Sequence, residues 1–294
     1  MTLSSSPLEK HCFRGREIYV KRDDLLHVDF SGNKARKFMW FLNQEFPHVK
    51  RVVSYGSNQS NAMYSLSVMA RLRAWEFVYF CNQIPDFLKL NPAGNYRYAL
   101  ENGMKIFESS QRREDAKSSC EKDDLLIEEG GRQSEAEFGI KILADELRDD
   151  VKKEGIEKPY IFLPSGTGTT ALLLKKNLSF RVFTCSTVGD DEYLKEQFKE
   201  LENDEQNFPK ILSSAKKYHY GKLDFELYEL WLELQADMGV TFDLMYDPVG
   251  WKKFLLHIDD IVGTPIYIHQ GGVLGNKTMI ERYKRKYENS KNKR

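Results

Sequence analysis

The chain has 294 residues, of which 41% are hydrophobic and 30% are charged, a composition that excludes a disordered protein. Its 44 basic and 44 acidic residues balance, and the basic residues are spread along the chain, so no nucleic-acid-binding patch is expected. No apolar run reaches the roughly 18 residues of a membrane helix, and the N-terminus lacks a signal-peptide core. The four cysteines and six histidines show no metal-ligand spacing, so no metal site is expected. These features predict a cytoplasmic protein without nucleic-acid or membrane partners.

Segments rich in β-branched and aromatic residues alternate with helical segments, which is typical of an α/β fold. In the first half we predict strands at 17–20, 51–54, 76–80, 105–107 and 125–127, helices at 35–44, 61–72 and 95–102, and a polar surface excursion at 109–124. A long helix to about residue 153 precedes strands at 159–163, 181–186, 242–246 and 265–269, a mostly helical region at 190–236 and a frayed basic tail at 283–294. The β-α-β-α-β order predicts open twisted sheets of parallel strands with right-handed crossovers.

Lys34 lies in the phrase SGNKARK, after small residues and directly before the cations Arg36 and Lys37. Neighbouring positive charges lower the pKa of a lysine, and a lowered pKa supplies the free amine that a Schiff base requires. A solvated lysine at the start of a helix is the alternative interpretation.

A second phrase, PSGTGTT, connects the predicted strand 159–163 to a helix. Its glycines, Gly166 and Gly168, let backbone N–H groups approach an anion closely, and the following helix adds its positive end. The pattern GxxxxGK[ST] is absent, and GxGxxG is matched only in part because Ala171 replaces the last glycine. A turn without a ligand is the alternative. Together, the amine and the loop suit a cofactor with an aldehyde and a phosphate, which is pyridoxal phosphate.

A third phrase, SYGSNQSN, follows the buried strand predicted at 51–54. Its hydroxyl and amide groups can bind a carboxylate and a phenolic oxygen without adding charge. The alternative is a helix start that is capped by Ser57 or Asn58.

The phrases KRDDLL, SGNKARK, SNQS, SGTGTT, YDPVGWKK and HQGG occur in an order that resembles pyridoxal-phosphate enzymes of the tryptophan-synthase-β type, fold type II. Within that group the chain is most similar to the D-cysteine desulfhydrase and 1-aminocyclopropane-1-carboxylate (ACC) deaminase family. The resemblance extends over roughly residues 15 to 280. The lysine phrase together with SNQ is the more specific part, whereas the glycine loop is shared with many relatives.

The resemblance implies roles for individual residues around the cofactor. Lys34 is similar to the Schiff-base lysine that also moves the substrate proton, and Asn58 to the asparagine that binds the phenolic oxygen. Lys37 is implied as a supporting cation for the phosphate. The phosphate loop is implied to consist of Gly166, Thr167, Gly168 and Thr169.

Substrate contacts are implied by the same resemblance. Ser57 and Gln59 are similar to the residues that hold the substrate carboxylate, and Ser57 is also a candidate for proton transfer. Tyr220 resembles the tyrosine of the family's YG phrase, which faces the substrate.

Two departures concern the ring of the cofactor. Relatives generally have a tyrosine after DPV, followed by Thr or Glu, where this chain has Gly250 and Trp251. Relatives have Thr where this chain has Gln270. We expect Trp251 to replace the stacking tyrosine and Gln270 to contact the pyridine nitrogen. A neutral partner makes the ring a weaker electron sink, which favours β-elimination over opening of a cyclopropane.

The resemblance implies two α/β domains, a large one of residues 1–40 and 142–294 and a smaller inserted one of residues 41–141, with the cofactor between them. It also implies a homodimer. The expected activity is that of a lyase or deaminase which converts a small amino acid, such as D-cysteine, to a 2-oxo acid and ammonia. Three alternatives stay open: a β-replacement enzyme such as an O-acetylserine sulfhydrylase, a pyridoxal-phosphate-binding protein without turnover, and an α/β binding protein without this cofactor.

Overall fold

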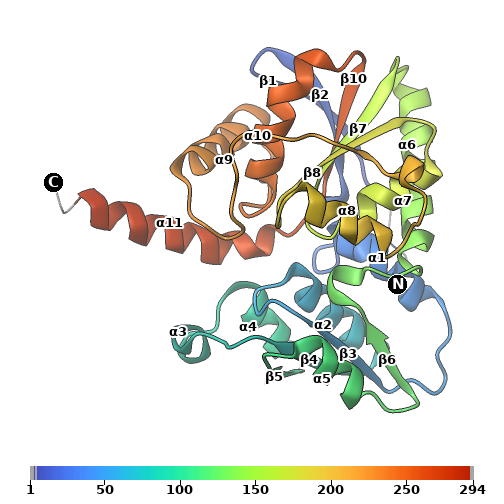
Figure 1. Ribbon diagram of the computed structural model, residues 1–294, viewed down its shortest axis with the longest axis vertical. Helices are drawn as coiled ribbons and strands as arrows, with labels where there is room; N and C mark the ends of the chain where they lie inside the picture. The colour runs from blue at the N-terminus through green and yellow to red at the C-terminus, as the bar shows by residue number, and fades with distance from the viewer. Residues whose placement is uncertain (1–2, 4, 292–294) are drawn as a thin grey trace.

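The computed structural model describes residue 3 and residues 5–291, and these form two open sheets that are stacked along the long axis of the molecule (Figure 1). The larger sheet has the order β1-β2-β10-β7-β8-β9, and all its pairs are parallel except the antiparallel pair β1–β2. Its strands are β1 (Leu8–Phe13), β2 (Arg16–Arg22), β7 (Pro159–Ser165), β8 (Arg181–Ser186), β9 (Lys210–Ile211) and β10 (Thr264–His269).

The smaller sheet has the order β5-β4-β3-β6 and is parallel throughout. Its strands are β3 (Arg51–Gly56), β4 (Glu76–Cys81), β5 (Met104–Glu108) and β6 (Asp124–Ile127), and its helices are α2 (Asn61–Arg73), α3 (Asp86–Leu90), α4 (Gly94–Glu101) and α5 (Arg112–Ser119). The predicted α/β fold with parallel sheets is therefore confirmed, whereas domain boundaries near residues 41 and 141 remain a proposal.

Side chains of the central strand β7 alternate between two layers of helices, because successive residues of a strand point to opposite faces. Ile161 and Leu163 join a core with the first helical layer, and Tyr160 and Phe162 join a core with the second. The first layer contains α6 (Ala136–Glu154) and α7 (Thr169–Asn177), and the second contains α9 (Phe225–Met238), α10 (Asp247–His257) and α11 (Asn276–Lys291).

Several segments differ from the sequence-based predictions. Residues 109–124 contain helix α5, which is held by a single buried residue, Ala116, against Val53 and Val78. Residues 242–246 are not a strand, because the Leu244 N–H donates to the Asn276 side chain at 2.7 Å instead of to a neighbouring strand. The region 190–236 contains two helices, α8 (Asp191–Lys199) and α9, separated by an irregular segment that includes β9.

The tail that we expected to fray continues as helix α11 up to Lys291, and residues 292–294 lie outside the described part. Within residues 3 and 5–291, no helix combines the length and the apolar character needed to cross a bilayer.

Helix α1 (Gly32–Asn43) lies between the two sheets in Figure 1 and is anchored by buried charges. The Arg36 guanidinium, which is fully buried, bonds Asp23 at 2.8 Å and Glu146 at 2.7 Å. Lys21 bonds the same Glu146 at 3.0 Å. This cluster ties α1 to α6 and to the end of β2, and it thereby fixes the helix whose first turn carries Lys34.

Glu146→Gln is expected to destabilise the protein by about 2 kcal/mol at pH 7, because the amide keeps the shape of the side chain but not the charge-assisted bonds. Burial raises the pKa of Glu146, but the bonds and charges of Arg36 and Lys21 outweigh it and lower the pKa below the ordinary 4.5. A lowered carboxyl pKa contributes stability above the ordinary value, and that contribution is lost as the pH falls. The difference between the two proteins, measured by urea unfolding, should therefore shrink on acidification below about pH 4.5.

The matched control is Glu101→Gln, which removes the exposed 2.7 Å pair of Glu101 with Arg97 on α4. A surface pair of this kind contributes only about 0.5 kcal/mol. Equal losses of stability in the two variants would contradict the anchoring role of the buried cluster.

Candidate active site

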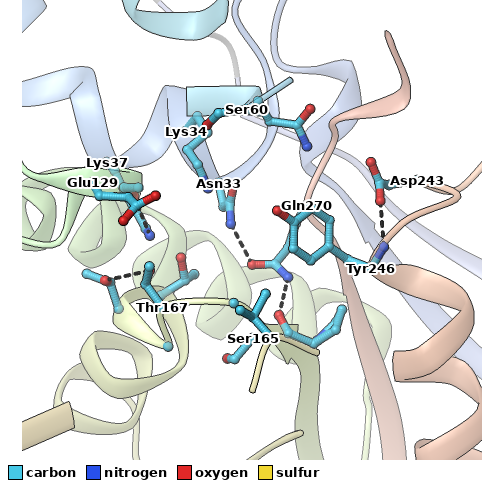
Figure 2. A pocket seen from close by; sticks show the side chains of 18 of the residues that line it. Asn33, Lys34, Lys37, Ser60, Glu129, Ser165, Thr167, Asp243, Tyr246 and Gln270 are labelled. Atoms are coloured by element: carbon cyan, nitrogen blue, oxygen red, sulfur yellow. Dashed lines mark hydrogen bonds between the residues drawn. The ribbon is translucent and has the colours of Figure 1, made fainter. Parts of the chain in front are cut away.

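A cavity of about 330 Å³ lies where strands of both sheets end (Figure 2). Ser165 and Gln270 reach its wall from the carboxyl ends of β7 and β10, and Ser57 reaches it after β3. Ligands of open α/β sheets bind at this edge of the strands. The three phrases singled out in the sequence therefore meet at one cavity.

Lys34 lies in the first turn of α1 and lines the cavity. Its Nζ donates to Asn33 Oδ1 at 3.2 Å. Burial lowers the pKa of Lys34 to about 8, against the charge of Asp243, which raises it. Burial, more than the neighbouring cations considered in the sequence analysis, thus makes the amine available at a pH near 8.

The glycine loop forms a tight turn between β7 and α7. Gly168 has φ +71°, and a Cβ at this position would lie 2.3 Å from a ring carbon of Phe198, so only glycine fits. The Thr170 hydroxyl is buried in the cavity wall and, among the described residues, has no hydrogen-bond partner. An unpaired donor at a helix N-terminus beside free backbone N–H groups suits an anion.

Lys37 lies one turn after Lys34 and also lines the cavity. Its Nζ donates to the Gly130 carbonyl oxygen at 2.9 Å. Burial, together with the charges of Lys34 and Arg132, lowers the pKa of Lys37 well below its ordinary value. An anion beside it would restore the charged form, which is consistent with the predicted supporting role.

Only part of the SNQ phrase reaches the cavity. Ser57 lines it, and so do Ser60 and Asn61, which the sequence analysis did not single out. Asn58 instead donates to the Gln83 carbonyl oxygen at 3.2 Å, and Gln59 lines a separate, smaller cavity. Ser60 accepts the N–H groups of residues 62 and 63 as the cap of α2, and the turn before it holds Asn58 and Gln59 away from the main cavity wall.

Trp251 does not lie in the cavity wall, so the structure gives no support to its predicted stacking role. The side chain is fully buried in the core of the larger sheet, where it stacks on Tyr267 with ring centroids 4.4 Å apart. Gly250, just before it, faces Pro164, whose Cβ would lie 2.8 Å from an added Cβ. A large side chain at position 250 therefore has no room.

Tyr246 and Asp247 line the cavity from the N-terminus of α10, one helical turn before Gly250 and Trp251. The segment Asp243-Leu-Met-Tyr-Asp247 also has a tyrosine three residues after an aspartate, as in the DPV phrase of relatives, with Asp247 where they have Thr or Glu. The sequence thus contained a signal for this pair, which the literal match to DPV at 247–249 passed over.

Gln270 lines the cavity with both ends of its amide engaged. Its Nε2 donates to the Pro164 carbonyl oxygen at 2.6 Å, and its Oε1 accepts from Asn33 Nδ2 at 2.9 Å (Figure 2). The residue therefore joins the end of β7 to the start of α1. Its predicted contact with a ring nitrogen remains a proposal, and both polar ends already have protein partners.

Asp247 brings a carboxyl group to the cavity that sequence reasoning missed. Its Oδ1 accepts from the Tyr267 hydroxyl at 2.6 Å, and its Oδ2 accepts from the Asp243 N–H at 3.0 Å. Burial, followed by the charge of Asp243, raises its pKa well above the ordinary value. A cationic group beside it would draw Asp247 back to the ionised form.

Tyr220 lines the cavity and is 40% exposed, which places it at the mouth. Its hydroxyl lies 2.9 Å from the hydroxyl of Tyr246. The predicted tyrosine therefore lies at the mouth of the cavity. Arg112 and Glu129, which the sequence analysis did not select, line the cavity from the side of the smaller sheet.

Comparisons with known proteins identify relatives of this chain. The chain is 24% identical over 288 residues to a putative ACC deaminase of Thermotoga maritima, covering 89% of this chain and 90% of that protein. It is 24% identical over 333 residues to a putative mitochondrial D-cysteine desulfhydrase 2 of Oryza sativa subsp. japonica, covering 90% and 79%. The chain is a relative of these proteins. No family model matches it.

Solved structures share the fold. An ACC deaminase homologue superposes with a TM-score of 0.73 at 19% identity, covering 92% of this chain and 90% of that one. A threonine deaminase from T.th. gives a TM-score of 0.69 at 15% identity, covering 92% of each chain. Serine racemase of Dictyostelium discoideum gives 0.68 at 15% identity, covering 92% and 93%. The family resemblance and the fold class predicted from the sequence are therefore confirmed.

Proposed function

We propose that the protein is a pyridoxal-phosphate-dependent lyase or deaminase that converts a small amino acid to a 2-oxo acid and ammonia. The observation that carries this proposal is that the half-buried Lys34 lines the same cavity as the glycine loop at residues 165–170. The enzyme class and the cofactor agree with the ACC deaminase and D-cysteine desulfhydrase relatives. The choice among substrates is part of the proposal.

The residues present fit pyridoxal phosphate. The unpaired Thr170 hydroxyl, the loop Gly166 to Thr169 and the nearby amine of Lys37 would hold the phosphate. When bound, this cofactor supplies an aldehyde that condenses with amines and a ring that withdraws electrons from the α-carbon of an amino acid. Lys34 is the amine in the cavity wall that is available for the aldehyde.

Lys34 also serves as the base that moves the α-proton of the substrate. With a pKa of about 8, its Nζ is partly unprotonated near neutral pH and can both accept and return a proton. Asn33, which accepts the Nζ hydrogen bond, orients the amine. The buried anchor of Arg36 holds the helix that carries it.

Asp247 is our proposed partner for the ring nitrogen, and Tyr246 is the proposed stacking residue. A carboxylate keeps the nitrogen protonated and strengthens the ring as an electron sink. The expected preference for β-elimination depended on a neutral Gln270 as the partner. With Asp247 in the wall, opening of a cyclopropane is as compatible with the site as β-elimination.

The start of α2 would bind the substrate carboxylate. Ser57 and Ser60 line the cavity here, and the helix N-terminus attracts an anion. Because it lines the cavity, we assign Ser57 a part in proton transfer as well. A cavity of about 330 Å³ that also holds a cofactor leaves space for a small amino acid only. A homodimer and a cytoplasmic location remain predictions.

The test is a product analysis of the protein loaded with pyridoxal phosphate. We expect ammonia and a 2-oxo acid from D-cysteine or from ACC, with sulfide released in the first case. Formation of a new amino acid from O-acetylserine and added sulfide, without ammonia from the other two, would show β-replacement instead. Bound cofactor without any product would indicate a binding protein.

A further inference from the structure

Asp243 is a buried carboxyl group of the cavity that the proposed function does not yet use. It is 4% exposed and lines the wall at the end opposite the glycine loop, with Gln270 between them in Figure 2. Oδ1 accepts the N–H groups of Met245 and Tyr246 at 2.8 and 2.7 Å, as a helix cap does. The carboxyl group is thereby held rigidly.

The second oxygen, Oδ2, is directed away from this cap. A Cβ added to Gly272 would lie 2.9 Å from Asp243 Oδ2 and 2.3 Å from Asn61 Nδ2. The Asp243 carboxyl group and the Asn61 amide therefore both lie against Gly272. The Asn61 side chain hydrogen-bonds the carboxyl group. Lys34 belongs to the same cavity wall, and among the described residues Asp243 is the carboxyl group whose charge acts on it.

We infer that Asp243 is the residue that accepts the proton of the entering amino acid's ammonium group. This inference rests on the proposed function, because an amine can attack a bound aldehyde cofactor only after it has lost that proton. In the step, an N–H bond of the ammonium breaks, an O–H bond forms at Asp243 Oδ2, and the electron pair stays on nitrogen. The proton can then pass to Lys34 when its amine becomes free.

The charges around Asp243 support this role. Burial raises the pKa of Asp243 to about 6, against the N–H groups of Tyr246 and Met245 and the charge of Lys34, all of which lower it. The carboxyl group is therefore ionised at neutral pH, and its proton passes favourably to Lys34, whose pKa is about 8. The titratable groups that face Asp243 are Lys34 on α1, Tyr220 in the preceding loop, Tyr246 and Asp247 at the start of α10, and Tyr267 on β10.

The test compares two amines in the Asp243→Asn variant, since the asparagine oxygen can still accept the N–H groups of Met245 and Tyr246 while the charge is removed. Methylamine is protonated at neutral pH and needs a base, whereas methoxyamine is already neutral. Both are mixed with the protein loaded with pyridoxal phosphate, and the change in cofactor absorbance gives the rate of capture. We expect the variant to capture methylamine at pH 7 about tenfold more slowly than wild type, and methoxyamine within about twofold.

The pH dependence provides a second readout. In the variant, capture of methylamine should rise about tenfold per pH unit, because only the amine already neutral in solution can react. In wild type it should stay high down to about pH 6. Asp224→Asn is the control, because Asp224 caps α9 through the Glu226 N–H at 3.0 Å and does not line the cavity. It should behave as wild type.

Equal slowing of both amines would overturn the role of Asp243, because it would show that the substitution distorts the site. Slowing of neither amine would also overturn it, because the variant would then lack no base that the wild type uses. A wild-type protein that acquires no cofactor absorbance would instead refute the proposed function itself. The two failures are therefore distinguishable.

Discussion

Lys34→Ala is expected to remove the visible absorbance of the bound cofactor and to lower turnover by about 1,000-fold or more. The variant lacks the side chain that we propose both joins the aldehyde and moves the α-proton. The measurement is an absorbance spectrum of the purified protein, beside wild type, followed by assay of ammonia release. Uptake of the cofactor by the cofactor-free wild type should accelerate as the pH rises through about 8, because the attacking amine must be unprotonated.

Lys37→Ala is the matched comparison, because this lysine lines the same cavity one helical turn away. It should keep the absorbance at saturating cofactor and lose about tenfold in cofactor affinity, since it supports the phosphate and not the aldehyde. If Lys34→Ala retains the absorbance while Lys37→Ala loses it, the assignment of the two lysines is wrong.

Gly32→Ala is expected to destabilise the protein by about 4 kcal/mol and to prevent cofactor binding. Gly32 has φ +68°, and an added Cβ would lie 1.9 Å from the backbone oxygen of Gln270. Backbone atoms cannot yield as a flexible side chain does, so α1 and the loop after β10 must separate. That movement breaks the 3.0 Å bond between the Asn33 N–H and the Gln270 oxygen and displaces Lys34.

Gly15→Ala separates backbone strain from this clash. Gly15 has a similar φ of +75°, but no atom lies within 4 Å of an added Cβ. It should cost only about 1 kcal/mol, the penalty of the left-handed conformation, and leave cofactor binding unchanged. Urea unfolding of both variants gives the comparison. Similar losses would show that strain alone accounts for the effect at Gly32.

The local phrases of the site could be predicted because their chemistry is contained in a few consecutive residues. Lys34 follows a glycine that permits a tight turn, and the glycine loop directly follows a buried strand. Asn58 and Gln59 could not be placed in the same way. Their phrase was recognised, but the cap formed by Ser60 decides which side chains of the turn face the cavity.

The register of α10 shows the limit of matching a phrase. The apolar residues of 242–246 look like a strand in the sequence, yet Asp243 accepts the N–H groups of Met245 and Tyr246 in a turn there, and α10 begins at Asp247. Residues one turn apart lie on the same side of a helix but about 5.4 Å apart along its axis, so the residues one turn later lie beyond the cavity wall. Trp251 is therefore buried against Tyr267, and Tyr246 and Asp247 take the positions at the cavity.

The amino-acid sequence by itself determined the class of fold and singled out Lys34 and the glycine loop, since each depends on short-range pattern and backbone freedom. Only the tertiary structure decided which carboxyl groups share the cavity with that amine. Asp243 and Asp247 are more than 200 residues from Lys34 along the chain. Their charges act on the site because the fold places them in the same cavity wall, away from water. Burial and mutual approach are properties of packed elements, and no local pattern of residues encodes them.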